Sequence, residues 1–179
     1  NFGGSGKSND RGWCPGGTLI LRSLMMNNLF DISGKVIVVT GATGVLAGGA
    51  AQYLQQNGAK VIYLGRNPER VSLSVEEARK ISGDCMGLTC NVLDENALQT
   101  GYLEVIKEFG HIDALINGAG GNMPGANIGP DQDIFNLDIS DYSKVMDLNL
   151  TGTVLPTLVF GKAFQEQGHG CVINFSSMS

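Results

Sequence analysis

The stretch Lys35-Val-Ile-Val-Val-Thr-Gly-Ala-Thr-Gly-Val-Leu46 decides the fold. Its first half, 35–40, is an apolar, β-branched run of the kind found in strands that are buried on both faces. Gly41 and Gly44 then allow a tight turn, and the apolar spacing of 46–57 predicts a helix. A strand, a glycine-rich turn and a helix start in this order favour a phosphate site, because the helix amino terminus offers N–H groups to an anion.

The same alternation of strands and helices continues along the chain. Strands are predicted at 60–64, 86–90, 114–117 and 171–175, and helices at 68–81, 95–109 and 141–167, the last bent at Pro156. This order predicts an α/β fold, a doubly wound parallel sheet of Rossmann type. Ligands of such sheets bind at the carboxyl ends of the strands.

Composition narrows the class of protein. The chain has 179 residues, of which 42% are apolar and 16% charged, as expected of one globular domain, which we place at 25–179. The glycine- and serine-rich segment 1–24 is expected to be a disordered or non-native extension. A net charge of −5 does not favour nucleic acid or anionic membranes as partners, and no apolar run is long enough to span a membrane.

The four cysteines predict neither a metal site nor a disulfide framework. None belongs to a CxxC pair, and no histidine cluster accompanies them. Free thiols fit a reducing compartment, so a cytoplasmic location is expected.

The end of the second predicted strand bears on the choice between NAD and NADP. Gly65-Arg66-Asn67 stands where an acidic residue would bind a ribose 2′-hydroxyl, and no carboxylate follows until Glu69. Arg66 can bind a 2′-phosphate through its fork of donors, with Asn67 beside it. We therefore expect NADP(H) rather than NAD(H), although a solvated Arg66 stacked on adenine remains an alternative.

The next two strand ends also carry candidate cofactor contacts. Asn91 can read the adenine edge and Val92 can pack on the ring, although Asn91 can equally be only a turn former. Asp94 is expected to cap the following helix. Asn117-Gly118-Ala119-Gly120 follows the fourth strand, and its small residues would let a flat cofactor lie against the sheet edge.

Four motifs together resemble the short-chain dehydrogenase/reductase family over about residues 26–179. They are the TGxxGxx turn at 40–46, the NxAG segment at 117–120, the Asn-Leu-x-Gly segment at 149–152, and Val172-Ile-Asn-Phe-Ser-Ser177. The resemblance implies hydride transfer between NAD(P) and a small-molecule alcohol or carbonyl. It also implies that the sheet is truncated after the fifth strand. The helix at 141–167 resembles one that family members use to form tetramers, so a homo-oligomer, a tetramer or dimer, is expected, although the apolar face of this helix could equally serve the core.

The resemblance assigns roles to individual residues. Ser177 matches the serine that hydrogen-bonds the substrate oxygen, and Asn149 matches the asparagine that holds a bent helix open around a proton-relay water. Gly41 and Gly44 match glycines that bind the pyrophosphate. Thr43 and Leu46, in the same turn, are expected to contact the cofactor as well.

Departures from the family pattern limit what this chain is expected to do alone. Ala47 stands where a third glycine is common, and no tyrosine is followed by lysine four residues later. That Tyr–Lys pair is the family's general acid/base, so we expect a fragment that binds cofactor without turning over substrate. A non-catalytic dinucleotide-binding module or redox sensor is the alternative.

The local sequence also suggests a substrate class. The segment 118–125, together with Gly65-Arg66-Asn67, is similar to the sugar-acid branch of the family, which includes D-mannonate oxidoreductase and fructuronate reductase. The expected substrate is therefore a keto or hydroxy sugar acid.

Overall fold

A computed structural model describes residues 30–177 of the chain. The chain divides into two compact units, Asn1–Asp31 and Ile32–Ser179, and the architecture below is that of the second unit. The extension predicted at 1–24 lies outside the described residues.

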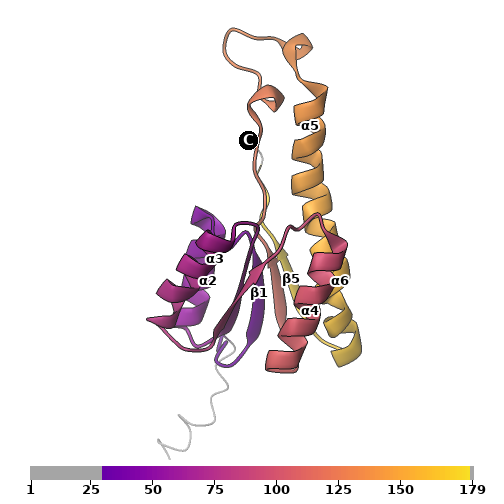
Figure 1. Ribbon diagram of the computed structural model, residues 1–179. Coiled ribbons are helices and arrows are strands. Elements are labelled where there is room, and N and C mark those ends of the chain that lie inside the picture. Colours follow the sequence, from indigo (N-terminus) through magenta and orange to yellow (C-terminus); the bar gives the residue numbers. More distant parts are fainter. Residues whose placement is uncertain (1–29, 178–179) are drawn as a thin grey trace, which may run out of the picture. The chain divides into compact units, whose positions relative to one another are not determined.

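The second unit contains a parallel five-stranded sheet with helices on both faces (Figure 1). The strands lie in the order β3-β2-β1-β4-β5 and are β1 (Val36–Thr40), β2 (Lys60–Gly65), β3 (Cys85–Thr89), β4 (Ala114–Asn117) and β5 (Cys171–Asn174). The helices are α2 (Val45–Gln56), α3 (Pro68–Arg79), α4 (Glu95–Phe109), α5 (Ile139–Met146) and α6 (Gly152–Gln167). The fold class predicted from the sequence is confirmed.

The alternation of side chains along β1 builds two cores. Val36 and Val38 pack on one face of the sheet with residues of α4 and α6, whereas Ile37 and Val39 pack on the other face with residues of α2 and α3. Since successive strand residues point to opposite faces, a run without polar residues is what a doubly covered strand requires.

Side chains cap three of the helices at their amino ends. Asn67 accepts a hydrogen bond from the N–H of Arg70 at the start of α3, and Asp94 accepts one from Ala97 at the start of α4, as predicted for Asp94. Asp138 caps α5. Helix α2 differs, because Gly44 occupies its cap position and no side chain caps it. Its first-turn N–H groups are therefore left for another partner.

A buried polar network ties α2 to its neighbours. Gln55 is 1% exposed, and its Nε2 donates to the backbone oxygens of Ala78 and Ser82, both at 2.9 Å. Its Oε1 accepts from the hydroxyl of Tyr63 at 2.9 Å. Burial raises the pKa of Tyr63 to about 12, with a smaller contribution from Cys85, so the hydroxyl remains a donor at neutral pH.

The long helix predicted at 141–167 has a π-helical turn around Asn149, where the family resemblance implies a bent helix but the helical pattern itself gives no sign of one. Helices α5 and α6 are joined by this turn, η3, at Asp147–Thr151. The departure from α-helical geometry therefore lies before Pro156, where the bend was expected, and α6 continues through that buried proline. Pro156 removes one backbone hydrogen bond from α6, because proline has no N–H to donate to the carbonyl four residues earlier.

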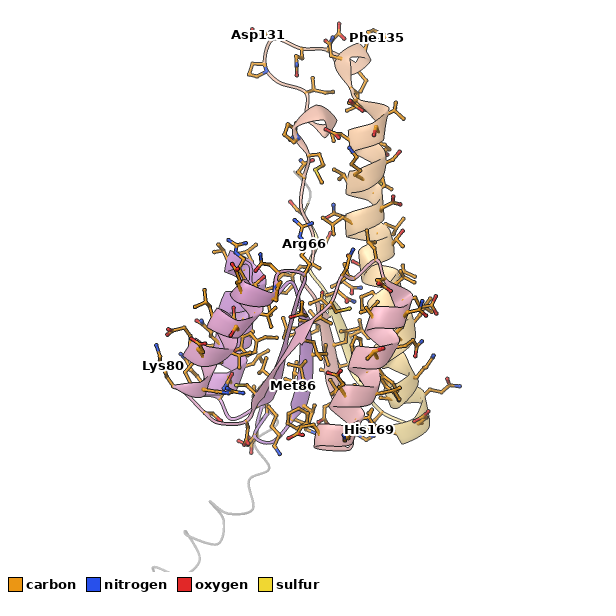
Figure 2. The ribbon with its side chains drawn as sticks, viewed as in Figure 1. Arg66, Lys80, Met86, Asp131, Phe135 and His169 are labelled. Atoms are coloured by element: carbon orange, nitrogen blue, oxygen red, sulfur yellow. The ribbon has the colours of Figure 1, made fainter. Side chains whose placement is uncertain are left out.

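Two short 3₁₀ helices, Pro124–Ala126 and Ile134–Asn136, lie in the segment between β4 and α5. Figure 2 shows Asp131 and Phe135 at the far tip of this segment, beyond the carboxyl ends of the strands. Within residues 30–177, none of the helices combines the length and the apolar character that a membrane crossing requires.

Candidate cofactor and substrate site

A cavity of about 190 Å³, the first cavity, lies at the carboxyl ends of β1, β2, β3 and β4. It is lined by Gly41, Thr43, Gly44, Leu64, Gly65, Arg66, Arg70, Cys90, Asn91, Val92, Gly118, Ala119, Gly120 and Leu148. Nine of these residues were predicted as cofactor contacts from the sequence: Gly41, Thr43, Gly44, Arg66, Asn91, Val92, Gly118, Ala119 and Gly120. The fold thus brings residues from four separate strand ends to one place.

The glycine turn after β1 is packed against the loop after β4. Gly41 has a φ of +68°, and a Cβ at this position would lie 2.7 Å from the backbone oxygen of Gly118. Thr40 holds the same contact, because its Oγ1 accepts from the N–H groups of Gly118 and Ala119, both at 3.1 Å. Together with the uncapped start of α2, this turn gives an anion access to backbone donors, which fits a pyrophosphate.

Two arginines reach the same cavity. Arg66 follows β2 and Arg70 lies in the first turn of α3, and both are exposed. Neither guanidinium has an ion pair with the residues described, and no aspartate or glutamate lines the cavity. Figure 2 shows Arg66 above the carboxyl ends of the strands, at the end opposite His169. The positive charge is therefore available to an anionic ligand.

Asn91 is both a turn former and a cavity residue. Its Oδ1 accepts from the N–H of Leu93 at 3.1 Å, which leaves its Nδ2 without a partner among residues 30–177. Val92 is buried, and one of its methyl groups lies where a side chain on Gly152 would collide with it. Burial raises the pKa of the neighbouring Cys90 thiol to about 11, with a smaller contribution from the charge of Asp94. The thiol is therefore protonated at neutral pH.

A larger cavity of about 620 Å³, the second cavity, lies beside the first. Both are lined by Gly118, Ala119 and Gly120. The second cavity is also lined by Leu46, Gly121, Asn122, Val145, Met146, Asn149, Leu150, Thr153, Phe175, Ser176 and Ser177. The two residues to which the sequence resemblance assigns catalytic roles, Asn149 and Ser177, therefore share one cavity.

Asn149 holds the π-helical turn against the loop after β4. Its Oδ1 accepts from the N–H of Gly121 at 3.2 Å, and its Nδ2 donates to the oxygen of Gly121 at 2.7 Å and to that of Val145 at 2.8 Å. The bond to Val145 satisfies a carbonyl within the helix where the regular hydrogen-bond pattern changes. Leu148, the preceding residue, lines the first cavity, so this turn contacts both cavities.

Three predicted cofactor contacts lie outside the first cavity. Leu46 lines the second cavity instead, and Asn67 caps α3. Asn117 is buried beneath the site, where its Nδ2 donates to Thr157 at 3.0 Å and to Asn174 at 2.9 Å. Its Oδ1 is buried without a hydrogen-bond partner among the described residues. Asn117 thus links β4, β5 and α6 below the cavities.

Sequence reasoning missed Leu64, Gly65, Arg70, Cys90 and Leu148, all of which line the first cavity. Arg70 had a usable signal, since a residue in the first turn of a helix after a parallel strand lies at the same sheet edge as the strand end. Leu148 had none, because it comes from a distant helix whose position only the tertiary fold determines.

Known proteins with similar sequences and structures are oxidoreductases. An uncharacterised oxidoreductase, UxuB of Bacillus subtilis, is 35% identical over 157 residues, which cover 83% of this chain and 56% of that protein. The D-threitol dehydrogenase of Mycolicibacterium smegmatis is 30% identical over 150 residues, covering 84% and 55%. The chain thus spans about half the length of these curated relatives.

A similar solved structure is also that of an assigned oxidoreductase. The crystal structure of a Haemophilus influenzae protein with bound NAD, provisionally assigned as a D-mannonate oxidoreductase, is 33% identical with a TM-score of 0.74. The match covers 83% of this chain and 56% of that chain. Residues 35–179 match the family described as short chain dehydrogenase. The chain therefore belongs to the short-chain dehydrogenase family.

Proposed function

We propose that this chain binds NADP(H) in the first cavity. Gly41 and Gly44 would hold the pyrophosphate, and Asn91 and Val92 the adenine. The shared wall at 118–120 would lie beside the nicotinamide. The glycine turn supports this placement, because its close packing and the uncapped start of α2 present backbone N–H groups to an anion.

The observation that carries the preference for NADP(H) is the pair of arginines, Arg66 and Arg70, in a cavity without a carboxylate. A 2′-phosphate supplies the negatively charged partner that these guanidinium groups lack, whereas NAD offers only a hydroxyl there. The Haemophilus relative holds NAD in its crystal structure, so the two cofactors must be compared directly on this chain.

In the whole protein, the proposed reaction is reversible hydride transfer between the nicotinamide and a carbonyl or alcohol in the second cavity. Ser177 would donate a hydrogen bond to the substrate oxygen and stabilise its developing negative charge as a carbonyl is reduced. Asn149 would keep the π-helical turn in place beside it. The acid/base tyrosine and lysine of the family are not present in this chain, so we propose that the chain alone is inactive.

We propose a keto or hydroxy sugar acid as the substrate class. The second cavity combines polar groups at Asn122, Thr153 and Ser176 with apolar walls, as a small hydroxylated ligand requires. The names of two relatives, a D-threitol dehydrogenase and the D-mannonate assignment, also refer to polyhydroxylated compounds.

The whole protein is also proposed to be a homo-oligomer. Leu150, Val154 and Leu158 are exposed at intervals of four residues along η3 and α6. Residues so spaced lie on one side of a helix, and a second copy could cover this apolar stripe. Light scattering across a range of protein concentrations tests this, and a monomer at every concentration would contradict it.

The cofactor proposal is tested by fluorescence titration of the purified chain with NADPH, with circular dichroism confirming a folded helical and sheet structure. Saturable binding to one site, without consumption of NADPH when carbonyl substrates are added, is the expected result. A folded chain that shows no saturable binding contradicts the proposal. Turnover by the chain would contradict its proposed inactivity.

A further inference from the structure

The polar groups of the second cavity differ in how much hydrogen-bonding capacity they retain. Asn149 retains no donor, because both hydrogens of its Nδ2 are used by the carbonyls of Gly121 and Val145. The hydroxyl of Thr153 donates to the backbone oxygen of Asn149 at 2.8 Å, so it too has no donor left. Neither side chain can donate to a ligand without breaking a bond that shapes the π-helical turn.

Asn122 is held in place and still keeps spare capacity. Its Oδ1 accepts from the N–H of Met123 at 2.9 Å, and its Nδ2 donates to Oδ1 of Asn127 at 2.6 Å. The Met123 N–H can only donate, so the Asn122 atom facing it is the oxygen. Asn127 is fixed in turn, because its Nδ2 donates to the oxygen of Met123 at 3.3 Å.

A carboxamide has two N–H donors and an oxygen that accepts two hydrogen bonds. Asn122 uses one donor and one acceptor position within the described part of the chain, so one of each remains. A donor and an acceptor on one immobilised amide match a hydroxyl group, which both donates and accepts. The side chain lines the same cavity as Ser177 but comes from a different loop, the one after β4 rather than the one after β5.

We propose that Asn122 is a specificity-determining residue that binds a hydroxyl group of a polyhydroxylated substrate, away from the oxygen held by Ser177. This inference rests on the proposed function, in which the second cavity receives the substrate. Asn122 takes no part in the proton or hydride transfer, and its effect is confined to substrate selection.

The test measures ligand binding by ligand-observed NMR on the chain saturated with NADPH. D-mannonate is compared with hexanoate, which has the same carbon chain and carboxylate but no hydroxyl groups. NADPH cannot oxidise D-mannonate, so both ligands form non-reacting complexes. Asn122→Ala is expected to weaken D-mannonate binding about fivefold and to leave hexanoate binding unchanged, as the loss of one hydrogen bond implies.

Two further variants separate recognition from folding. Asn127→Ala removes the support of Asn122 and is expected to cause a smaller loss that is also specific for D-mannonate. Asn96→Ala, an exposed asparagine on α4, serves as the matched control and should leave both ligands unaffected.

Each negative outcome has a distinct meaning. If NADPH does not bind the wild-type chain, the proposed function fails along with this inference. If NADPH binds but D-mannonate binds no better than hexanoate, the inference about Asn122 and the proposed substrate class are overturned, whereas the cofactor proposal stands. The inference about Asn122 alone is overturned if Asn122→Ala weakens both ligands equally or neither.

Discussion

The strands beneath the two cavities differ in burial. Every residue of β1 is buried, and so is all of β2 except Lys60, whereas every residue of β5 is exposed, with Val172 and Ile173 at 37% and 46%. The turns of the first cavity therefore stand on strands packed on both faces. The second cavity has one wall on a strand whose apolar side chains remain exposed. The contrast shows that the proposed cofactor cavity rests on strands that are packed on both faces, whereas the proposed substrate cavity borders a strand that the described residues leave exposed.

The largest effect is expected for a substitution of Gly41, in the turn after the buried strand β1. Gly41→Ala places a methyl group 2.7 Å from the oxygen of Gly118 in a residue with positive φ, so the turn must move. NADPH affinity should fall by at least about 100-fold in fluorescence titration.

Gly34→Ala is the matched control for this substitution. Gly34 has a similar φ of +75° but open space around its Cβ position. It shares the backbone strain without the collision. An equal loss of NADPH affinity in both variants would show that strain or misfolding, rather than the close approach at Gly41, is responsible.

A second substitution tests the buried packing itself. Gln55→Ala leaves the buried Tyr63 hydroxyl without its partner and removes the side-chain bonds to the carbonyls of Ala78 and Ser82. The free energy of unfolding should fall by about 2–3 kcal/mol in urea denaturation. The exposed neighbour Gln56→Ala should change it by less than about 0.5 kcal/mol. Similar values for the two variants would contradict the role of the network.

A substitution of Asn149 tests the second cavity, which borders the exposed strand β5. Asn149→Ala removes both bonds to Gly121 and the one to Val145, so the loop after β4 should loosen next to the second cavity. The amide of Gly121 should exchange with deuterium roughly tenfold faster, as expected when about 1.4 kcal/mol of local stability is lost. Unchanged exchange at Gly121 would contradict the role of Asn149 in holding this loop.

The smallest expected effect is on the pH dependence of stability, through Asp113 at the foot of the sheet. Burial acts to raise the pKa of this carboxyl, but hydrogen bonds from the Lys35 ammonium and the Val36 N–H, with the charges of Lys35 and His111, lower it below its ordinary value. A lowered folded-state pKa contributes stability above the unfolded pKa of about 3.9, which is lost as the pH falls through the folded value.

Wild-type protein should therefore lose more stability than Asp113→Asn as the pH falls from 5 towards 3, measured by urea denaturation at each pH. The exposed Asp131→Asn serves as the control and should follow the wild-type curve. Parallel curves for wild type and Asp113→Asn would contradict the contribution of Asp113.

Much of the fold could be predicted because the buried strands have clear sequence patterns. The β-branched run before Gly41 and the glycines that end the helices define elements whose observed bounds lie within about two residues of the predicted ones. The helical pattern of 141–167 does not show the π-helical turn, and only the family resemblance implies a bent helix around Asn149, whose side chain bonds a loop 28 positions away in the sequence.

The site was predictable where it depends on backbone turns and less so where it depends on tertiary position. Gly41, Gly44 and Gly118 follow from the need for close backbone approach. Leu46 was assigned to the cofactor from its place in the turn, but the first turn of α2 directs it to the second cavity. Arg70 was missed because only the residues directly after the second strand were considered as cofactor contacts.

We propose above all that Arg66 and Arg70 together make the first cavity selective for NADP(H). The most direct test is the ratio of the dissociation constants for NADH and NADPH, measured by titration of the wild-type chain and of Arg66→Ala/Arg70→Ala. We predict at least about tenfold tighter binding of NADPH by wild type and a ratio near one for the double variant, with NADH affinity almost unchanged. Equal affinities for the two cofactors in wild type, or a ratio that the double variant leaves intact, would contradict the claim.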